Sequence, residues 1–174
     1  MKNLFIIAAL LLTSIAYSQG FSNEKNVRLE DYELSPVPSS GMAKAEAHIR
    51  KIISSRDTLF LYQIEIFNPF NTSFPTSLTA SLTKEDIVEA REALTVLLEQ
   101  SKGDVESKAN YINNKYSFES GFSIGYVIDK KGSVTWFFHQ ENELREEIFW
   151  VKSINEIVKT FSEATVIMEQ LENE

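Results

Sequence analysis

The stretch GFSIGYVIDKKGSVTWFFHQ, residues 121–140, decides the fold of this chain. Two runs rich in β-branched and aromatic residues, 121–128 and 133–140, flank the polar tetrapeptide 129–132, which ends in Gly132. Runs of this composition favour strands, and a short glycine-containing turn between them favours an antiparallel hairpin. We therefore expect a sheet built from hairpins of this kind.

Further strand candidates lie on both sides of this hairpin. Residues 111–118 and 146–152 are candidates in the second half of the chain. In the first half, 58–67 is rich in aromatic and β-branched residues, and 78–82 has the length of a short strand. Residues 43–50 alternate small or apolar residues with polar ones, which predicts a strand with one buried and one solvent-exposed face.

Two stretches have the periodicity of a helix instead. One begins after Thr83 and ends at Gly103, and the other begins after Ser153. Thr83 with Asp86 and Ser153 with Glu156 have the spacing of a capping box, which satisfies backbone donors at the start of a helix. The apolar stripes expected to face the core are Ile87, Ala90, Leu94, Leu97 and Leu98 in the first helix, and Ile154, Ile157, Val158, Phe161, Met168 and Leu171 in the second.

These elements predict an α+β fold in which strands are followed by a helix twice. We expect a two-layer sandwich, in which two amphipathic helices cover one face of a mostly antiparallel sheet of about six to seven strands. Residues 81–100 align with 151–170 without gaps, and both cap positions coincide. This match indicates an internal β-β-β-α duplication, with pseudo-repeats at about 42–103 and 104–174 of a single domain, 42–174.

The first 18 residues have the pattern of a secretory signal peptide. Lys2 is followed by an unbroken apolar run, 4–12, and Ala16-Tyr17-Ser18 places small residues before a cleavage point. The run is shorter than the roughly 20 apolar residues that span a bilayer. We therefore expect export to the periplasm or the extracellular medium, with no membrane insertion after cleavage. Residues 19–41, which include two prolines and a glycine, are expected to form an extended leader without regular structure.

Charge and composition exclude several kinds of partner. The chain has 174 residues, a formal net charge of -8 and no cysteine. An excess of acidic residues argues against nucleic acid, because binding to the phosphate backbone needs clustered Lys and Arg. The absence of cysteine excludes disulfides, so the fold must be stabilised by its core alone. The acidic balance is typical of a soluble surface.

Motifs for catalysis and metal binding are present only in fragments. Residues 121–125 match G-x-S-x-G, but the segment continues as a strand, whereas a nucleophile elbow needs a turn from strand into helix. We therefore interpret Ser123 as an outward-facing strand residue, although Asp129 and His139 follow it in hydrolase order. His48 and His139 are the two histidines and lack the spacing of a zinc site, so we expect no metal and no cofactor. The acidic group Glu141, Glu143, Glu146 and Glu147 is interpreted as a solvated loop.

The sequence favours a non-catalytic function: an exported soluble domain that binds a protein partner or a small molecule. The site is expected on the open sheet face or in the loop 68–76, where Phe70 and Phe74 are aromatic residues between two prolines. One alternative is an exported hydrolase with an unrecognised acid/base site on the same face, and another is a carrier of an apolar ligand. The candidate surface residues are His48, Arg50, Glu65, Phe70, Phe74 and His139, and the open face is expected to include Lys44, Glu46, Gln63, Ser123 and Thr135 as well.

Overall fold

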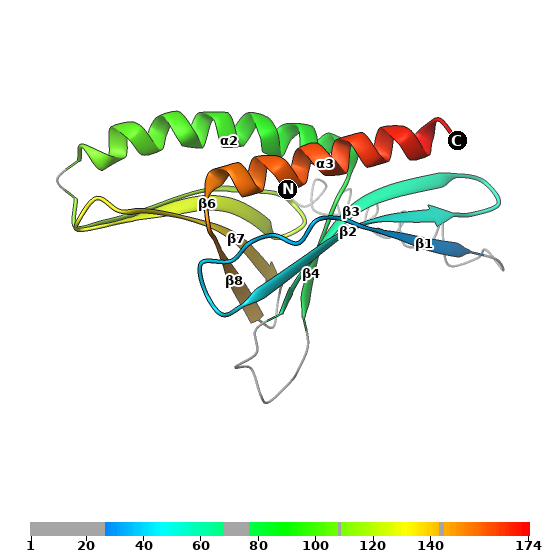
Figure 1. Cartoon of the computed structure of the whole chain (residues 1–174), viewed down its shortest axis with the longest axis horizontal. Coiled ribbons are helices and arrows are strands. Elements are labelled where there is room, and N and C mark those ends of the chain that lie inside the picture. The colour runs from blue at the N-terminus through cyan, green and yellow to red at the C-terminus, as the bar shows by residue number, and fades with distance from the viewer. Residues whose placement is uncertain (1–26, 68–76, 108, 143–144) are drawn as a thin grey trace, which may run out of the picture. The chain divides into compact units, whose positions relative to one another are not determined.

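The computed structural model describes residues 27–67, 77–107, 109–142 and 145–174 (Figure 1). These residues belong to two compact units, 31–50 with 60–174 and 27–30 with 51–59. The smaller unit contains a hairpin turn that Ser54 closes. Its backbone N–H donates to the Asp57 carbonyl oxygen at 2.9 Å, and its hydroxyl accepts from the Asp57 N–H at 3.0 Å.

The strands form two four-stranded sheets, each with its strands in sequence order. Pairing is antiparallel, so each sheet is a meander of hairpins. Sheet A contains β1 (Arg28–Glu33), β2 (Lys44–Ile53), β3 (Thr58–Phe67) and β4 (Leu78–Leu82). Sheet B contains β5 (Tyr111–Ser117), β6 (Phe122–Asp129), β7 (Val134–Asn142) and β8 (Arg145–Val151).

The α+β class and the antiparallel pairing are confirmed, but the expected single sheet of about six to seven strands is wrong. A helix follows β4, and β5 starts a second sheet instead of pairing with β4. The additional strand is β1, which lies within the leader that the sequence analysis left without regular structure. Contacts with other parts of the chain stabilise β1, because Tyr32 packs against the core and Asp31 pairs with Arg50 of β2.

Two helices, α2 (Lys84–Val105) and α3 (Ile154–Glu172), lie side by side (Figure 1). The helix α2 contacts β4, β5 and β6, whereas α3 contacts β8. The capping box of α2 is confirmed: Thr83 Oγ1 accepts from the Asp86 N–H at 3.2 Å, and Asp86 Oδ2 accepts from the Thr83 N–H at 2.8 Å. The second box is not formed, because Ser153 is extended and makes no side-chain cap hydrogen bond.

One hydrophobic core joins the two sheets and both helices within the larger unit. At its centre lies Phe161 of α3, which is fully buried. Its ring meets Tyr62 of sheet A edge-on at 5.5 Å between centroids and Phe138 of sheet B at 6.1 Å. Burial of one such side chain stabilises a fold by about 1.5–3 kcal/mol. The ring of Phe161 therefore contacts both sheets.

Candidate binding surfaces

The alternation along β2 separates a core face of sheet A from a polar face, which we call the outer face. Ala45, Ala47 and Ile49 are buried, whereas Lys44 and Glu46 between them are exposed. His48 and Arg50, on the outer face, are partly buried. The period of two in the sequence therefore sets the two faces of the sheet, as predicted.

A row of polar side chains crosses the outer face from β1 to β4. His48 Nε2 lies 3.8 Å from Asp31 Oδ1 and 3.1 Å from Gln63 Oε1. The Gln63 amide donates to Ser81 Oγ at 2.8 Å, across the paired strands β3 and β4. Hydrogen bonds therefore link side chains of β2, β3 and β4, and the Asp31 carboxylate of β1 lies beside His48 at the end of the row.

Asp31 and Arg50 form a two-pronged ion pair next to this row. Arg50 Nε and Nη2 donate to the two carboxylate oxygens at 2.7 and 2.8 Å. The hydrogen bond from Arg50 lowers the pKa of Asp31, and the same bond raises the pKa of Arg50. Both side chains therefore stay charged at neutral pH. Because both are partly exposed, solvent screens the pair and its contribution to stability is small.

A groove opens where the leader separates from β2, and we call it the leader groove. Its volume is about 590 Å³. Apolar side chains from the leader and from β2 line it together with a polar rim that includes His48 of the outer face. The lining residues are Asp31, Glu33, Leu34, Pro36, Val37, Ser39, Ala43, Lys44, Ala45, Glu46, Ala47 and His48.

Contacts of the leader with other elements keep this groove open. The Leu34 N–H still donates to the Ala47 carbonyl oxygen of β2 at 3.0 Å. From Ser35 the chain turns toward α3, where the Ser35 N–H and hydroxyl both donate to Glu163 Oε1. Further on, the carbonyl oxygen of Pro38 accepts from the backbone N–H of Lys152 after β8 at 3.0 Å. These bonds draw the leader away from β2 and leave a space between them.

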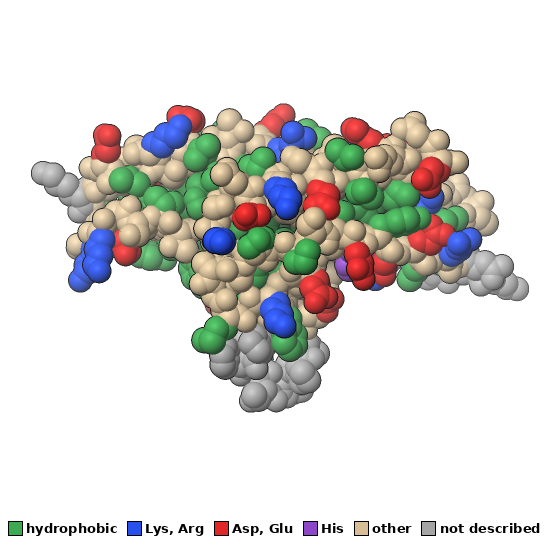
Figure 2. Space-filling model, viewed as in Figure 1, with side chains coloured by type: hydrophobic (Ala, Val, Ile, Leu, Met, Phe, Trp, Pro, Cys, Tyr) green, Lys and Arg blue, Asp and Glu red, His purple; other side chains and the backbone are tan. Residues whose placement is uncertain are grey.

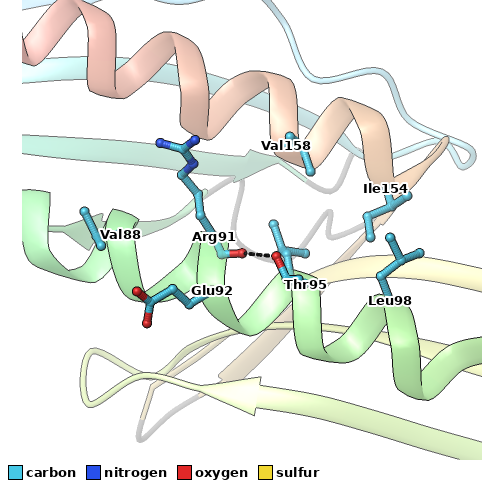
Figure 3. A pocket seen from close by; sticks show the side chains of 8 residues that line it. Val88, Arg91, Glu92, Thr95, Leu98, Ile154 and Val158 are labelled. Carbon is cyan, nitrogen blue, oxygen red and sulfur yellow. Dashed lines mark hydrogen bonds between the residues drawn. The ribbon is translucent and has the colours of Figure 1, made fainter.

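A second groove lies between α2 and α3, and we call it the helix groove (Figure 3). Its volume is about 440 Å³. Aliphatic side chains from both helices line it, and Arg91, Glu92 and Thr95 of α2 are its polar members. The aliphatic lining residues are Val88, Leu94, Leu98, Ile154 and Val158.

The predicted surface residues divide between the two sheets. His48, Arg50 and Glu65 lie on sheet A, where Glu65 accepts a hydrogen bond from the Ser77 hydroxyl. His139 belongs to β7 of sheet B and is only 5% exposed. Its Nε2 atom lies 3.2 Å from Glu146 Oε2. The expectation that His139 occupies a solvent-exposed face together with His48 is therefore wrong. Phe70 and Phe74 fall outside the described residues.

Ser123 is the second residue of strand β6, so the interpretation of G-x-S-x-G as a strand is confirmed. Its outward, solvent-facing placement is wrong, because the residue is 3% exposed and its hydroxyl shares a hydrogen bond of 2.9 Å with Ser117. Asp129 ends the same strand, where it accepts from the N–H groups of Lys131 and Ser133 in the turn. The aspartate is thus engaged at the opposite end of β6 from the serine. Thr135 also belongs to sheet B, in β7.

Charged side chains are distributed in both signs over the surface. Figure 2 shows acidic and basic side chains interspersed with apolar patches. Glu141 and Glu146 lie opposite each other on β7 and β8, so these two acids belong to a hairpin and not to the solvated loop expected for them. Within the part of the chain that the structure describes, no three His, Asp or Glu side chains are grouped so that they could hold a metal ion.

Sequence reasoning missed Asp31, Glu33 and Arg91. The first two were assigned to the leader, although residues 31–34 alternate polar and apolar side chains in the manner of a strand. Neither α2 nor α3 has the length and hydropathy of a membrane-spanning helix.

Comparisons of the chain with protein-family models, with curated proteins and with solved structures found no match. The surfaces described above are therefore the basis for a functional proposal.

Proposed function

We propose that this protein is an exported, non-catalytic binding domain whose ligand occupies the leader groove and the adjoining outer face of sheet A. The observation that supports this function is the composition of the groove. Leu34, Val37 and the alanines of β2 provide an apolar lining, and a few polar side chains form the rim. Ligand sites are typically concave, mostly apolar and about 300–1,000 Å³ in volume, with a small number of polar groups that orient the ligand.

The charges at the rim favour a ligand that carries a cationic group. Glu33 and Glu46 are exposed, whereas the Asp31 carboxylate is already paired with Arg50. Among the described residues that line the groove, Lys44 is the only Lys or Arg. An excess of carboxylates around an apolar floor suits a basic ligand with apolar groups, such as a peptide that contains Lys or Arg.

The Asp31–Arg50 pair on this surface has the character of a structural ion pair. A general acid or base works best when its pKa lies near the working pH. Here the pKa of Asp31 is lowered and that of Arg50 is raised, each through the hydrogen bond between them. Both shifts move the pKa away from neutrality, as expected for a structural ion pair and not for a proton-transfer site.

Two matched peptides test the proposed ligand class. Each has the same apolar residues, and one carries two Lys where the other carries two Glu. We expect calorimetry to show at least about tenfold tighter binding of the basic peptide, since a hydrogen bond to a charged group contributes about 1.5–3 kcal/mol. The double variant Glu33→Lys with Glu46→Lys should reverse that preference.

The control for charge is the double variant Glu119→Lys with Glu169→Lys. Both of these glutamates are exposed and lie outside the groove lining, and their replacement changes the net charge by the same amount. The control should bind like the unaltered protein. Equal affinity for the two peptides, or a preference that the groove variant leaves unchanged, would refute the proposed site.

Export is tested by the mass of the secreted product. The small residues Ala16 and Ser18 predict cleavage after Ser18, so the intact mass should correspond to residues 19–174, with a small loss if Gln19 cyclises. Secreted material should be recovered from the periplasm or the medium. Recovery of the full-length chain from the cytoplasm alone would contradict the proposed localisation.

A further inference from the structure

The helix groove has one cationic side chain, Arg91, that has no acidic neighbour on its own helix. Residues three and four positions away are Ile87, Val88, Leu94 and Thr95. Side chains at those spacings are the ones that meet on a helix surface, so no intrahelical ion pair is available to this guanidinium. In Figure 3 the Arg91 side chain extends from α2 toward α3 across the groove.

No other group in the described part of the chain pairs with this guanidinium. The ion pairs found there do not include Arg91, and its hydrogen bond within the groove is made by its backbone carbonyl, which accepts from Thr95 Oγ1 at 3.1 Å. Glu92 is next to it in sequence, but its carboxylate points away from the guanidinium in Figure 3. Adjacent residues on a helix do not face each other.

Apart from Arg91, Glu92 and Thr95, the groove is lined by aliphatic side chains, and two of these are exposed to solvent. Val88 is 48% exposed and Val158 is 42% exposed, one on each helix. Leu98 and Ile154 continue the aliphatic lining along the two helices, and all four side chains are labelled in Figure 3. Transfer of such surface out of water is favourable by about 25 cal/mol for each Å² buried.

We propose that the helix groove binds a single-chain anionic amphiphile, with its carboxylate on Arg91 and its hydrocarbon chain between the aliphatic residues of α2 and α3. A guanidinium presents paired N–H donors that match the two oxygens of a carboxylate. The groove volume of about 440 Å³ lies within the usual range for small-ligand sites. This site is separate from the leader groove and does not depend on the function proposed there.

Three probes separate the contributions of the charge and the chain. Dodecanoate has both the anionic head and the apolar chain, dodecyltrimethylammonium has the same chain with a cationic head, and acetate has the head alone. Calorimetry below the micelle-forming concentrations should give one dodecanoate site per protein. We expect binding at least about tenfold tighter than that of the cationic amphiphile, because of the charged hydrogen bonds, and no measurable binding of acetate.

Two variants and a control assign that binding to the groove. Arg91→Glu should weaken dodecanoate by at least about tenfold and bring the cationic amphiphile to equal or tighter binding. Thr95→Trp keeps the guanidinium but fills the groove, and it should abolish the binding of both amphiphiles. The control Lys159→Glu changes an exposed residue of α3 outside the groove lining by the same charge and should bind dodecanoate normally. Circular dichroism verifies that each variant is folded.

The remaining outcomes overturn the proposal. Equal binding of the two amphiphiles that is insensitive to Arg91→Glu would mean adsorption to apolar surface in general. Loss of dodecanoate binding in Lys159→Glu as well would assign the effect to net charge. Sedimentation that shows a dimer, dissociated by Thr95→Trp, would mean that a second copy of the chain occupies the groove.

Discussion

The two helices align in sequence at a displacement of 70 residues, but they have different roles in the fold. Displaced by 70 residues, Ile87 of α2 corresponds to Ile157 of α3, and both are buried. With the same displacement, Arg91 of α2 aligns with Phe161 of α3. The arginine is exposed over the helix groove, whereas the phenylalanine is fully buried between the two sheets. Equivalent positions in the two helices are therefore exposed to solvent in one case and buried in the core in the other.

The difference follows from what each helix packs against. The helix α2 contacts β4 of sheet A, β5 and β6 of sheet B, and α3. Phe161 of α3 meets rings from both sheets, Tyr62 from sheet A and Phe138 from sheet B. Arg91, at the equivalent position of α2, lines the helix groove and is exposed.

Tyrosine hydroxyls anchor both helices, but with different chemistry. Tyr126 of β6 donates to Asp104 Oδ2 near the end of α2 at 2.6 Å. Tyr62 of β3 shares a buried hydrogen bond of 3.1 Å with Thr160 of α3. The first anchor involves a charged acceptor and the second is neutral, so the two are expected to respond differently to pH.

The largest expected difference between the helices is the stability lost on substitution at the aligned positions Phe161 and Arg91. Phe161→Ala should lower the free energy of unfolding by about 3–5 kcal/mol, because it leaves a cavity where the sheets meet. Arg91→Ala, at the equivalent position, should change stability by less than about 0.5 kcal/mol, as exposed sites do. Urea unfolding of both variants measures the two values. A loss below about 1 kcal/mol for Phe161→Ala would mean that the buried face of α3 is wrongly assigned.

The next effect concerns the charged anchor of α2. Tyr126→Phe should cost about 1.5–3 kcal/mol at neutral pH, because it removes a partly buried hydrogen bond to a carboxylate. Burial, together with the bond to Asp104, raises the pKa of Tyr126 to about 12. The folded protein therefore holds this proton more tightly than the unfolded chain, in which the pKa of tyrosine is about 10.

The sign of the pH dependence follows from that shift. The stabilisation by the Tyr126 proton is complete below about pH 10 and is lost as the pH rises toward about 12. The stability difference between the unaltered protein and Tyr126→Phe should consequently shrink between about pH 8 and about pH 11. Urea titrations at both pH values measure it, and a constant difference would show that this hydroxyl does not carry the effect.

The smallest effect is expected at the helix starts. Thr83→Ala removes a formed capping box and should cost about 1 kcal/mol. Ser153→Ala removes a side chain that makes no cap hydrogen bond and should cost no more than a few tenths of that. Thermal or urea unfolding of the two variants compares them. Equal losses would indicate that Ser153 caps α3 in solution.

Local pattern was sufficient for the elements from β2 onward and for most of the buried side chains. Strand β2 was predictable because residues at a spacing of two lie on the same side of a strand. The helices were predictable from their apolar stripes, and Leu94, Phe161 and Met168 are buried as expected. The expectation that Val158 faces the core is wrong, because this side chain is 42% exposed and lines the helix groove. Export, the duplication and the binding function were also inferred from the sequence, and they remain predictions.

Tertiary contacts decided the rest, because these features depend on residues that are distant in the chain. Strand β1 forms through Asp31 with Arg50 and through Tyr32 against the core, neither of which is visible in local composition. The separation into two sheets depends on the partners of β4 and β5, which pair with β3 and β6 and not with each other. The periodicity of the sequence does not specify these partners. Both grooves arise in the same way, one where Ser35 is drawn toward Glu163 and the other where two helices meet, and the sequence alone contains no signal for either.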